Sequence, residues 1–317
     1  MSYPKEPILA VRCATFNHEK YIRDALEGFV KQKTDFCFIV IVHDDASTDK
    51  TAEIIREYEQ KYPHIIKPIY ETENQWSKRD GSLSRALRNA IPQGVKYVAL
   101  CEGDDYWTDP GKLQKQVDFL EKHPDYTMCF HNAEIKKENG VAADFEGYVI
   151  ENREYSATEL FAGWTVPTAS IVMRKEILDI PRQSPDFIYG DIVMIENCAH
   201  LGKVWGFGEY MSVYRMQATG VLWNDSSVAQ EKRLRRLPKH LIALKKFYPK
   251  ISREVANKRI SNNYMTLFLN YGTLLEKIKW LSLAFFYSPV RTIRKVLSMS
   301  KFLHGLYKRI KKRKRYD

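Results

Sequence analysis

Acidic side chains gather at two places in the first third of the sequence. The segment HDDAST carries Asp44 and Asp45, and the segment EGDDYW carries Glu102, Asp104 and Asp105. Each segment directly follows an apolar run of strand length. If the two clusters share one crevice, their carboxylates repel one another unless a cation joins them. Oxygen ligands of this kind suit Mg²⁺ or Mn²⁺, ions that usually share their coordination shell with a substrate phosphate.

Both clusters also have a structural interpretation. Asp45, Ser47 and Thr48 would cap the following helix by accepting hydrogen bonds from its free N–H groups. EGDD would be a solvated turn in which Gly103 adopts an unusual backbone angle.

A third acidic position begins a predicted helix in YGDIVMIENCAHLGK. Asp191 in its first turn is either stabilised by the helix dipole or serves as a general base. Glu196 and His200 lie further along this helix, and we expect them to be solvated or structural.

Four apolar runs place these residues on a sheet. Residues 8–14, 36–42, 65–70 and 95–101 have strand length, and amphipathic helix patterns separate them. Pro68 weakens the third strand, which we expect to be short or near an edge. This alternation predicts a parallel sheet covered on both faces, and ligands bind at the carboxyl ends of such strands. The two acidic clusters lie at those ends.

The rest of the chain has a different pattern. Residues 126–215 suggest short strands, a polar insertion around 136–152 and the helix that begins at Asp191, whereas the chain reads as helical from 226 onward. We therefore expect a catalytic domain at 1–225 and a helical C-terminal region at 226–317.

The positive charge is concentrated in the tail. The 317 residues contain 50 Lys+Arg and 39 Asp+Glu, a net charge of +11, and residues 291–317 hold eleven basic side chains and one acid. From 290 to 310 apolar and basic side chains fall on opposite faces of a predicted helix. This pattern is typical of an interfacial helix on an anionic membrane. A helix docked on the protein body is the alternative, and nucleic-acid binding is disfavoured because no aromatic stacking platform accompanies the charge.

Several observations bear on location and class. The five cysteines form no CxxC pair, which favours reduced thiols and a reducing compartment. The longest apolar run, residues 280–290, is about half of the ~20 residues that a spanning helix needs. We therefore expect a cytoplasmic protein, peripheral on the inner face of the cell membrane.

GxxxxGK[ST] and GxGxxG are absent from the sequence, which counts against a P-loop NTPase and a Rossmann dehydrogenase.

Five segments in order resemble the family 2 glycosyltransferases. They are ATFNHEKYIRDALEGFVKQKTDF, HDDASTDKT, ALCEGDDYWTDPGKLQKQVDFLEKHPDY, YGDIVMIENCAHLGK and VYRMQATGVLW, and the likeness covers about residues 8–223. The closest likeness is to bacterial members that build capsule, lipopolysaccharide or other surface glycans. The resemblance implies an α/β fold of the glycosyltransferase A type, here with a C-terminal helical extension. It also implies inverting transfer from a nucleotide-diphosphate sugar, UDP being expected, to a glycan or lipid-linked acceptor, with Mn²⁺ or Mg²⁺ as cofactor.

The resemblance also implies residue roles on the donor side. Ala14, Thr15 and Asp45 would line the nucleotide pocket. Glu102 to Asp104 match the DxD motif, with Glu102 in place of the usual Asp and Asp104 as the metal ligand. Asp105 would contact the donor sugar or brace the loop.

Further roles come from the later segments. Asp191 matches the catalytic base. Arg215 and Trp223 would contact the diphosphate and the acceptor or serve in packing. The family motif often has His where this chain has Gln217.

Two rival functions remain. One is a catalytically inactive, membrane-associated scaffold of the same fold. The other is a sugar nucleotidyltransferase, which would need a Gly-rich basic loop after the first strand, and no such loop is present. We further expect that the C-terminal helices support a homo-oligomer or the acceptor site.

Overall fold

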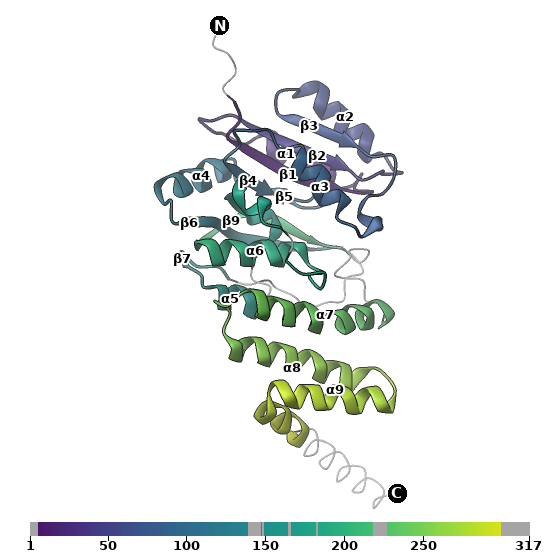
Figure 1. Ribbon diagram of the computed structural model, residues 1–317. Helices are drawn as coiled ribbons and strands as arrows, with labels where there is room; N and C mark the ends of the chain where they lie inside the picture. The colour runs from purple at the N-terminus through teal and green to yellow at the C-terminus, as the bar shows by residue number, and fades with distance from the viewer. Residues whose placement is uncertain are drawn as a thin grey trace, which may run out of the picture. The chain divides into compact units, whose positions relative to one another are not determined.

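The computed structural model describes residues 6–138, 147, 149–163, 166–181, 183–217 and 227–298. The chain forms two compact units (Figure 1). The first comprises Met1–Pro181 and Gly190–Asn224, and the second comprises Arg182–Tyr189 and Asp225–Asp317. Each unit is described by itself.

The first unit contains the predicted parallel strands. They are β1 (Leu9–Thr15), β2 (Phe38–Asp44), β3 (Ile66–Tyr70) and β4 (Tyr97–Leu100), in the order β3-β2-β1-β4. All neighbours among them run parallel. Because β1, β2 and β4 consist almost entirely of buried residues, their side chains face helices on both sides of the sheet. β3 lies at the edge, as Pro68 predicts.

The amphipathic patterns that separate these strands form helices, as expected. They are α1 (Ile22–Val30), α2 (Thr51–Lys61) and α3 (Ser82–Asn89), and α4 (Lys112–Lys122) follows β4. The expected capping of α2 by Asp45, Ser47 and Thr48 is wrong, because the N-cap position is Lys50 and it makes no side-chain cap hydrogen bond.

Beyond β4 the sheet becomes mixed. β8 (Val172–Arg174) runs antiparallel to both β4 and β6 (Tyr126–Lys137). β9 (Lys203–Met216) returns parallel to β6 after helix α6 (Gly190–Leu201). The expectation of short strands here is wrong for β6 and β9, which have 12 and 14 residues. Both continue into half-buried or polar residues, which an apolar-run criterion misses.

Shorter elements complete this unit. They are β5 (Tyr106–Trp107), which pairs with the end of β9, β7 (Arg153–Glu154), α5 (Ala157–Ala162) and the 3₁₀ turns η1 (Trp76–Lys78), η2 (Thr168–Ser170) and η3 (Lys175–Asp179). Pairing of β5 with β9 brings the EGDDYW segment to the strand that carries Arg215.

The second unit is helical, as predicted. It contains α7 (Ser227–Phe247), α8 (Arg253–Asn270) and α9 (Leu274–Tyr287), and residues 289–298 are also helical. Helix α8 packs against both α7 and α9 (Figure 1). The ring of Phe187 stacks on that of Tyr248 at 6.0 Å, which explains why 183–189 belongs to this unit. No helix within the described residues combines the length and the apolar character that crossing a membrane requires.

Candidate active site

The loops after β1 and β2 are held together by reciprocal hydrogen bonds. The backbone N–H of Asn17 donates to Ser47 Oγ at 2.9 Å, and the N–H of Thr48 donates to Asn17 Oδ1 at 2.8 Å. Asn17 has a positive φ of 54°, which an Asn tolerates better than most residues. Next along the chain, the N–H of His18 donates to Thr51 Oγ1 at 2.8 Å. These bonds fix the β1 loop to the start of α2.

Asp45 is buried and orders a third loop. Its Oδ1 accepts the N–H of Gln75 at 2.6 Å, and its Oδ2 accepts the N–H of Trp76 at 3.0 Å. The backbone N–H of Asp45 itself donates to the Thr15 carbonyl at 2.9 Å. The Asp45 carboxylate therefore stabilises the 3₁₀ turn η1, at the same sheet edge as the end of β1.

The EGDD loop is packed directly onto β1. The N–H of Gly103 donates to the Ala14 carbonyl at 2.9 Å. A Cβ at position 103 would lie 2.6 Å from Thr15 Oγ1 and 2.7 Å from Thr15 Cβ. Gly103 is not among the residues with a positive φ, so the expected unusual backbone angle is wrong. Close approach to Thr15 is the reason for glycine at this position.

Asp104 meets side chains from two distant segments. Its Oδ2 accepts a hydrogen bond from Gln217 Nε2 at 2.9 Å, and the same oxygen lies 4.0 Å from His18 Nε2. Burial is the main cause that lowers the pKa of His18, and the charge of Asp104 opposes it. The ring therefore favours the neutral form.

Arg215 holds this loop from behind. Its side chain is buried, its backbone N–H donates to Asp105 Oδ1 at 2.8 Å, and its Nη1 donates to the Asp104 carbonyl at 2.8 Å. Its Nη2 pairs with Asp24 on α1. The guanidinium also lies over the Tyr106 ring, 4.4 Å from its centroid. These contacts favour the packing role that the sequence analysis left open for Arg215.

Asp191 lies close enough to the EGDD loop for their charges to interact. Desolvation by the surrounding protein, together with the charges of Asp104 and Asp191, raises the pKa of Glu102, although Glu102 itself is exposed to solvent. Desolvation also raises the pKa of Asp191, against the opposing N–H of Ile192. Asp105 is buried, and desolvation followed by the charge of Asp104 raises its pKa well above the usual range.

The structure thus brings most predicted site residues to one sheet edge. The Thr15 carbonyl accepts the N–H of Asp45, and the Ala14 carbonyl accepts the N–H of Gly103. The charges of Glu102, Asp104 and Asp105 act on one another, and the charge of Asp191 acts on Glu102. Trp223 lies outside the described residues. His18 and Asp24 were not singled out from the sequence, because a lone His in a polar loop and a surface Asp on a helix carry no pattern. The only sequence signal for His18 is its place directly after the first strand.

The side chains at this site could hold only a metal ion that needs few protein ligands. No group of three or more His, Cys, Asp or Glu that could hold an ion is present among the described residues. Mg²⁺, and by analogy Mn²⁺, is often held by one or two carboxylates together with substrate phosphates and water. Asp104, whose side chain is 23% exposed, fits such a site as the protein ligand.

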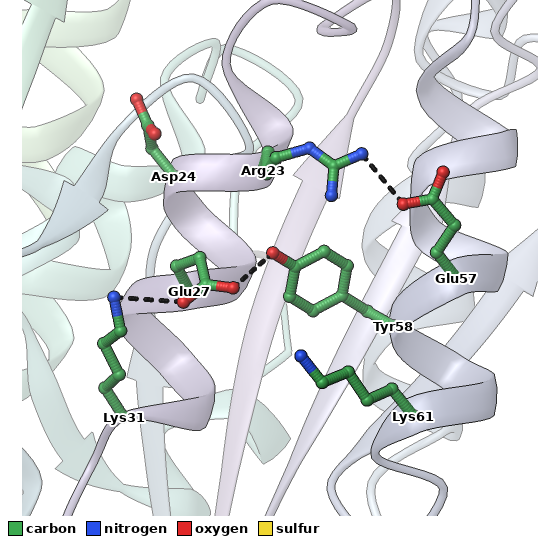
Figure 2. Close-up of a pocket in the computed structure, with 7 residues that line it drawn as sticks. All are labelled: Arg23, Asp24, Glu27, Lys31, Glu57, Tyr58 and Lys61. Atoms are coloured by element: carbon green, nitrogen blue, oxygen red, sulfur yellow. Dashed lines mark hydrogen bonds and ion pairs between the residues drawn. The ribbon is translucent and has the colours of Figure 1, made fainter.

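A charged recess of about 430 Å³ lies between α1 and α2 (Figure 2). Side chains that line it interact with one another. Arg23 Nη2 lies 2.8 Å from Glu57, and the Tyr58 hydroxyl donates to Glu27 at 2.5 Å (Figure 2). It contains none of the predicted site residues. Asp24 borders it and also pairs with Arg215, so α1 links this recess to the back of the EGDD loop.

Comparisons with known proteins identify the family of this chain. The profile of "Glycosyl transferase family 2" matches residues 12–179. An uncharacterized protein of Mycobacterium tuberculosis is 37% identical over 231 residues, which are 71% of this chain and 63% of that protein. The chain thus spans less than two thirds of that relative.

Two solved structures share the fold. TarS of Staphylococcus aureus in complex with UDP-GlcNAc has a TM-score of 0.62 at 16% identity, over 90% of this chain and 82% of TarS. The mannosyltransferase PcManGT of Pyrobaculum calidifontis, in complex with GDP-Man and Mn²⁺, has a TM-score of 0.52 at 18% identity, over 92% and 84%. At these identities the likeness supports the fold, a glycosyltransferase A-type sheet.

Proposed function

The chain belongs to glycosyl transferase family 2, and from that premise we propose that it moves a sugar from a nucleotide-diphosphate donor to an acceptor hydroxyl with inversion. UDP is the proposed nucleotide, as in the TarS complex, and residues 1–225 are the proposed catalytic part. The proposed acceptor is a glycan or a lipid-linked glycan of a bacterial surface polysaccharide.

The observation that carries this proposal is the interaction of Asp191 with the EGDD loop. These acids are far apart in sequence, yet the charge of Asp191 contributes to the raised pKa of Glu102. A base that begins helix α6 therefore lies near the motif proposed to hold the donor diphosphate. Such a pair is what transfer between two bound substrates requires.

Asp191 is the proposed general base. It would take the proton of the acceptor hydroxyl as that oxygen attacks the anomeric carbon from the face opposite the leaving nucleoside diphosphate. The carboxylate is suited to this because desolvation raises its pKa and thus its basicity. Acid–base assistance of this kind contributes about 10²–10⁴-fold to the rate.

The donor would be held by the loops at the sheet edge. Ala14, Thr15 and Asp45 are the proposed nucleotide contacts, the last either directly or through the turn η1 that it orders. Asp104 would hold Mn²⁺ or Mg²⁺, which when bound supplies positive charge to the departing diphosphate. Glu102 and Asp105 complete the proposed donor side, and Arg215 keeps their loop in place.

Substitution of the base tests this function. We expect Asp191→Asn to reduce turnover about 10²–10⁴-fold, because an amide does not accept the proton. UDP affinity by isothermal titration should remain within about twofold, since the donor contacts are unchanged. Asp186→Asn, at an exposed acid of the second unit, is the matched control.

Two outcomes would contradict the assignment. Normal turnover by Asp191→Asn would remove Asp191 as the base. Wild-type protein that neither transfers sugar nor hydrolyses donors, while still binding UDP, would favour the inactive scaffold.

The metal is tested through donor binding. Asp104→Ala should abolish the increase in UDP affinity that Mn²⁺ produces in the wild type, because its carboxylate is the proposed protein ligand. Equal activity in the presence and absence of a chelator would exclude the metal from the mechanism.

A further inference from the structure

Helix α9 exposes its apolar side. Five of its large apolar residues are between 48% and 79% exposed, namely Leu274, Leu275, Ile278, Phe285 and Phe286. At about 100° per residue they fall within an arc of roughly 120°. Trp280 and Ala284, on the opposite side of the helix, are buried in the second unit. A helix on the surface of a soluble protein normally has the reverse arrangement, with polar residues outside.

The following helix repeats this feature. In residues 289–298 four apolar side chains are between 38% and 62% exposed, namely Val290, Ile293, Val296 and Leu297. Thr292, the buried residue of this helix, lies within hydrogen-bond distance of Ser261 on α8. Two consecutive helices therefore expose apolar side chains, and exposed apolar surface of this kind marks interaction sites.

Positive charge accompanies this apolar surface. Residues 274–298 contain five Lys or Arg and one acid, and residues 299–317 contain eight and one. Together they carry the whole net charge of +11, so the rest of the chain is neutral. A second copy of the chain would bring the same positive charge against it, which disfavours self-association through these helices. An anionic lipid leaflet offers the complement to both features, apolar acyl chains and negative headgroups.

We propose that α9 and helix 289–298 bind an anionic lipid surface through this apolar face, defined by Leu274, Leu275, Ile278, Phe285, Phe286, Val290, Ile293, Val296 and Leu297. The helices lie in the interface, with basic residues such as Arg294 and Lys295 at the headgroups. The proposal extends the membrane contact expected for residues 290–317 to helix α9. It does not depend on sugar transfer.

Flotation with vesicles tests it on the full chain without donor or acceptor. Vesicles of three parts phosphatidylcholine to one part phosphatidylglycerol should bind the wild type, and vesicles of phosphatidylcholine alone should bind it much more weakly. The double variant Leu275→Ser/Phe286→Ser should partition at least about 100-fold less, because each side chain then loses its burial in lipid. Arg294→Gln and Lys295→Gln should each weaken binding to the anionic vesicles about fivefold.

The controls separate the apolar face from general stickiness and from the tail. Leu201→Ser on α6, where Leu201 is 61% exposed, should bind like the wild type. Removal of residues 299–317 should weaken binding but leave the loss caused by Leu275→Ser/Phe286→Ser in place. Wild-type binding by the double variant, or binding that depends only on residues 299–317, would overturn the proposal. So would a concentration-dependent dimer that the double variant abolishes while neither protein binds vesicles.

Discussion

At the scale of single residues, the Asp104 carboxylate is where distant parts of the chain meet. Gln217 at the end of β9 donates to it at 2.9 Å, and His18 after β1 places Nε2 4.0 Å from the same oxygen. The resemblance to the family places a His where Gln217 stands. In this structure His18, which is near the start of the sequence, places an imidazole beside Asp104. We interpret His18 and Gln217 as positioning residues for this carboxylate.

Substitution of His18 tests that interpretation. We expect His18→Ala to weaken Mn²⁺-dependent UDP binding about tenfold, because loss of a residue that orients a metal ligand costs about 10–100-fold in affinity. UDP binding without metal should change little. Isothermal titration with and without Mn²⁺ measures both. His64→Ala, at an exposed histidine, is the control, and an equal loss in the two His variants would argue against a local role.

Lys112 is a buried lysine that the proposed mechanism does not use. Its Nζ donates to Gln116 Oε1 at 2.8 Å and lies 4.1 Å from the centroid of the Trp107 ring. Desolvation lowers its pKa from 10.5 to about 7. Trp107 follows the EGDDY residues directly, so this lysine supports the α4 side of the same loop.

The pKa shift predicts a pH-dependent stability. Between pH 7 and 10.5 the unfolded chain binds a proton at Lys112 that the folded chain has lost, so the free energy of unfolding rises with pH there. The limiting slope for one group is about 1.4 kcal/mol per pH unit. In urea unfolding across this range, the slope of the wild type should exceed that of Lys112→Met by about this amount. Lys122→Met, at an exposed position of α4, should retain it, and parallel curves for wild type and Lys112→Met would contradict the prediction.

At the scale of elements, the site depends on how closely loops pack at the sheet edge. The EGDD loop touches the end of β1 with no room for one methyl group, since a Cβ on Gly103 would meet Thr15 at 2.6–2.7 Å. Strand β1 is central, with β2 and β4 hydrogen-bonded on either side, so it has little freedom to move. The loop would have to move instead, and with it Asp104.

Gly103→Ala should therefore reduce both stability and transfer activity. We expect about 1–3 kcal/mol of destabilisation, the usual cost of an extra methyl group in packed structure. Gly190→Ala is a matched control because a Cβ there meets nothing within 4 Å. Thermal unfolding and turnover of the two variants, side by side, give the comparison. Similar behaviour of both would mean that the contact with Thr15 relaxes at no cost.

Prediction from sequence succeeded for elements with a strong local pattern. We predicted β1, β2 and β4 because strands buried on both faces consist of consecutive apolar residues. We predicted the helix that begins around Asp191 because an acidic residue occupies its first turn. The extent of β6 and β9 was not found, because their pairing joins residues about 75 positions apart. Cys37 belongs to the apolar run 36–42, yet it lies just before β2 and is exposed.

At the scale of the whole molecule, the sequence located the acids of the candidate site but not the contacts that hold them. Carboxyl ends of parallel strands meet at one edge, so Asp45 and Asp104 were expected there. Two of these contacts are the hydrogen bond from the Gln75 N–H to Asp45, which orders η1, and the pair of Asp24 with Arg215. Both join residues that are far apart in the sequence and come together only on folding. The exposed apolar face of α9 was not predicted for the same reason. Packing of α9 against α8 determines which side of the helix remains exposed to solvent.

The two units have separate cores, and this separation is itself testable. Trp280 is buried in the second unit, where its ring lies under the Arg235 guanidinium at 4.8 Å and against Gly272, whose φ is +78°. Trp280→Ala should destabilise that unit by about 3–5 kcal/mol, the usual cost of removing a buried large aromatic side chain. Amide hydrogen exchange should then accelerate in α8 and α9 and remain unchanged in β1, β2 and β4.

The control for this experiment lies on the same helix. Phe286→Ala removes an aromatic ring that is 75% exposed, so exchange in α8 should stay near the wild-type rate. Faster exchange throughout both units of Trp280→Ala would show that they unfold as one. Acceleration confined to the second unit would mean that the sheet maintains the geometry of Asp104 and Asp191 without stability borrowed from the helices.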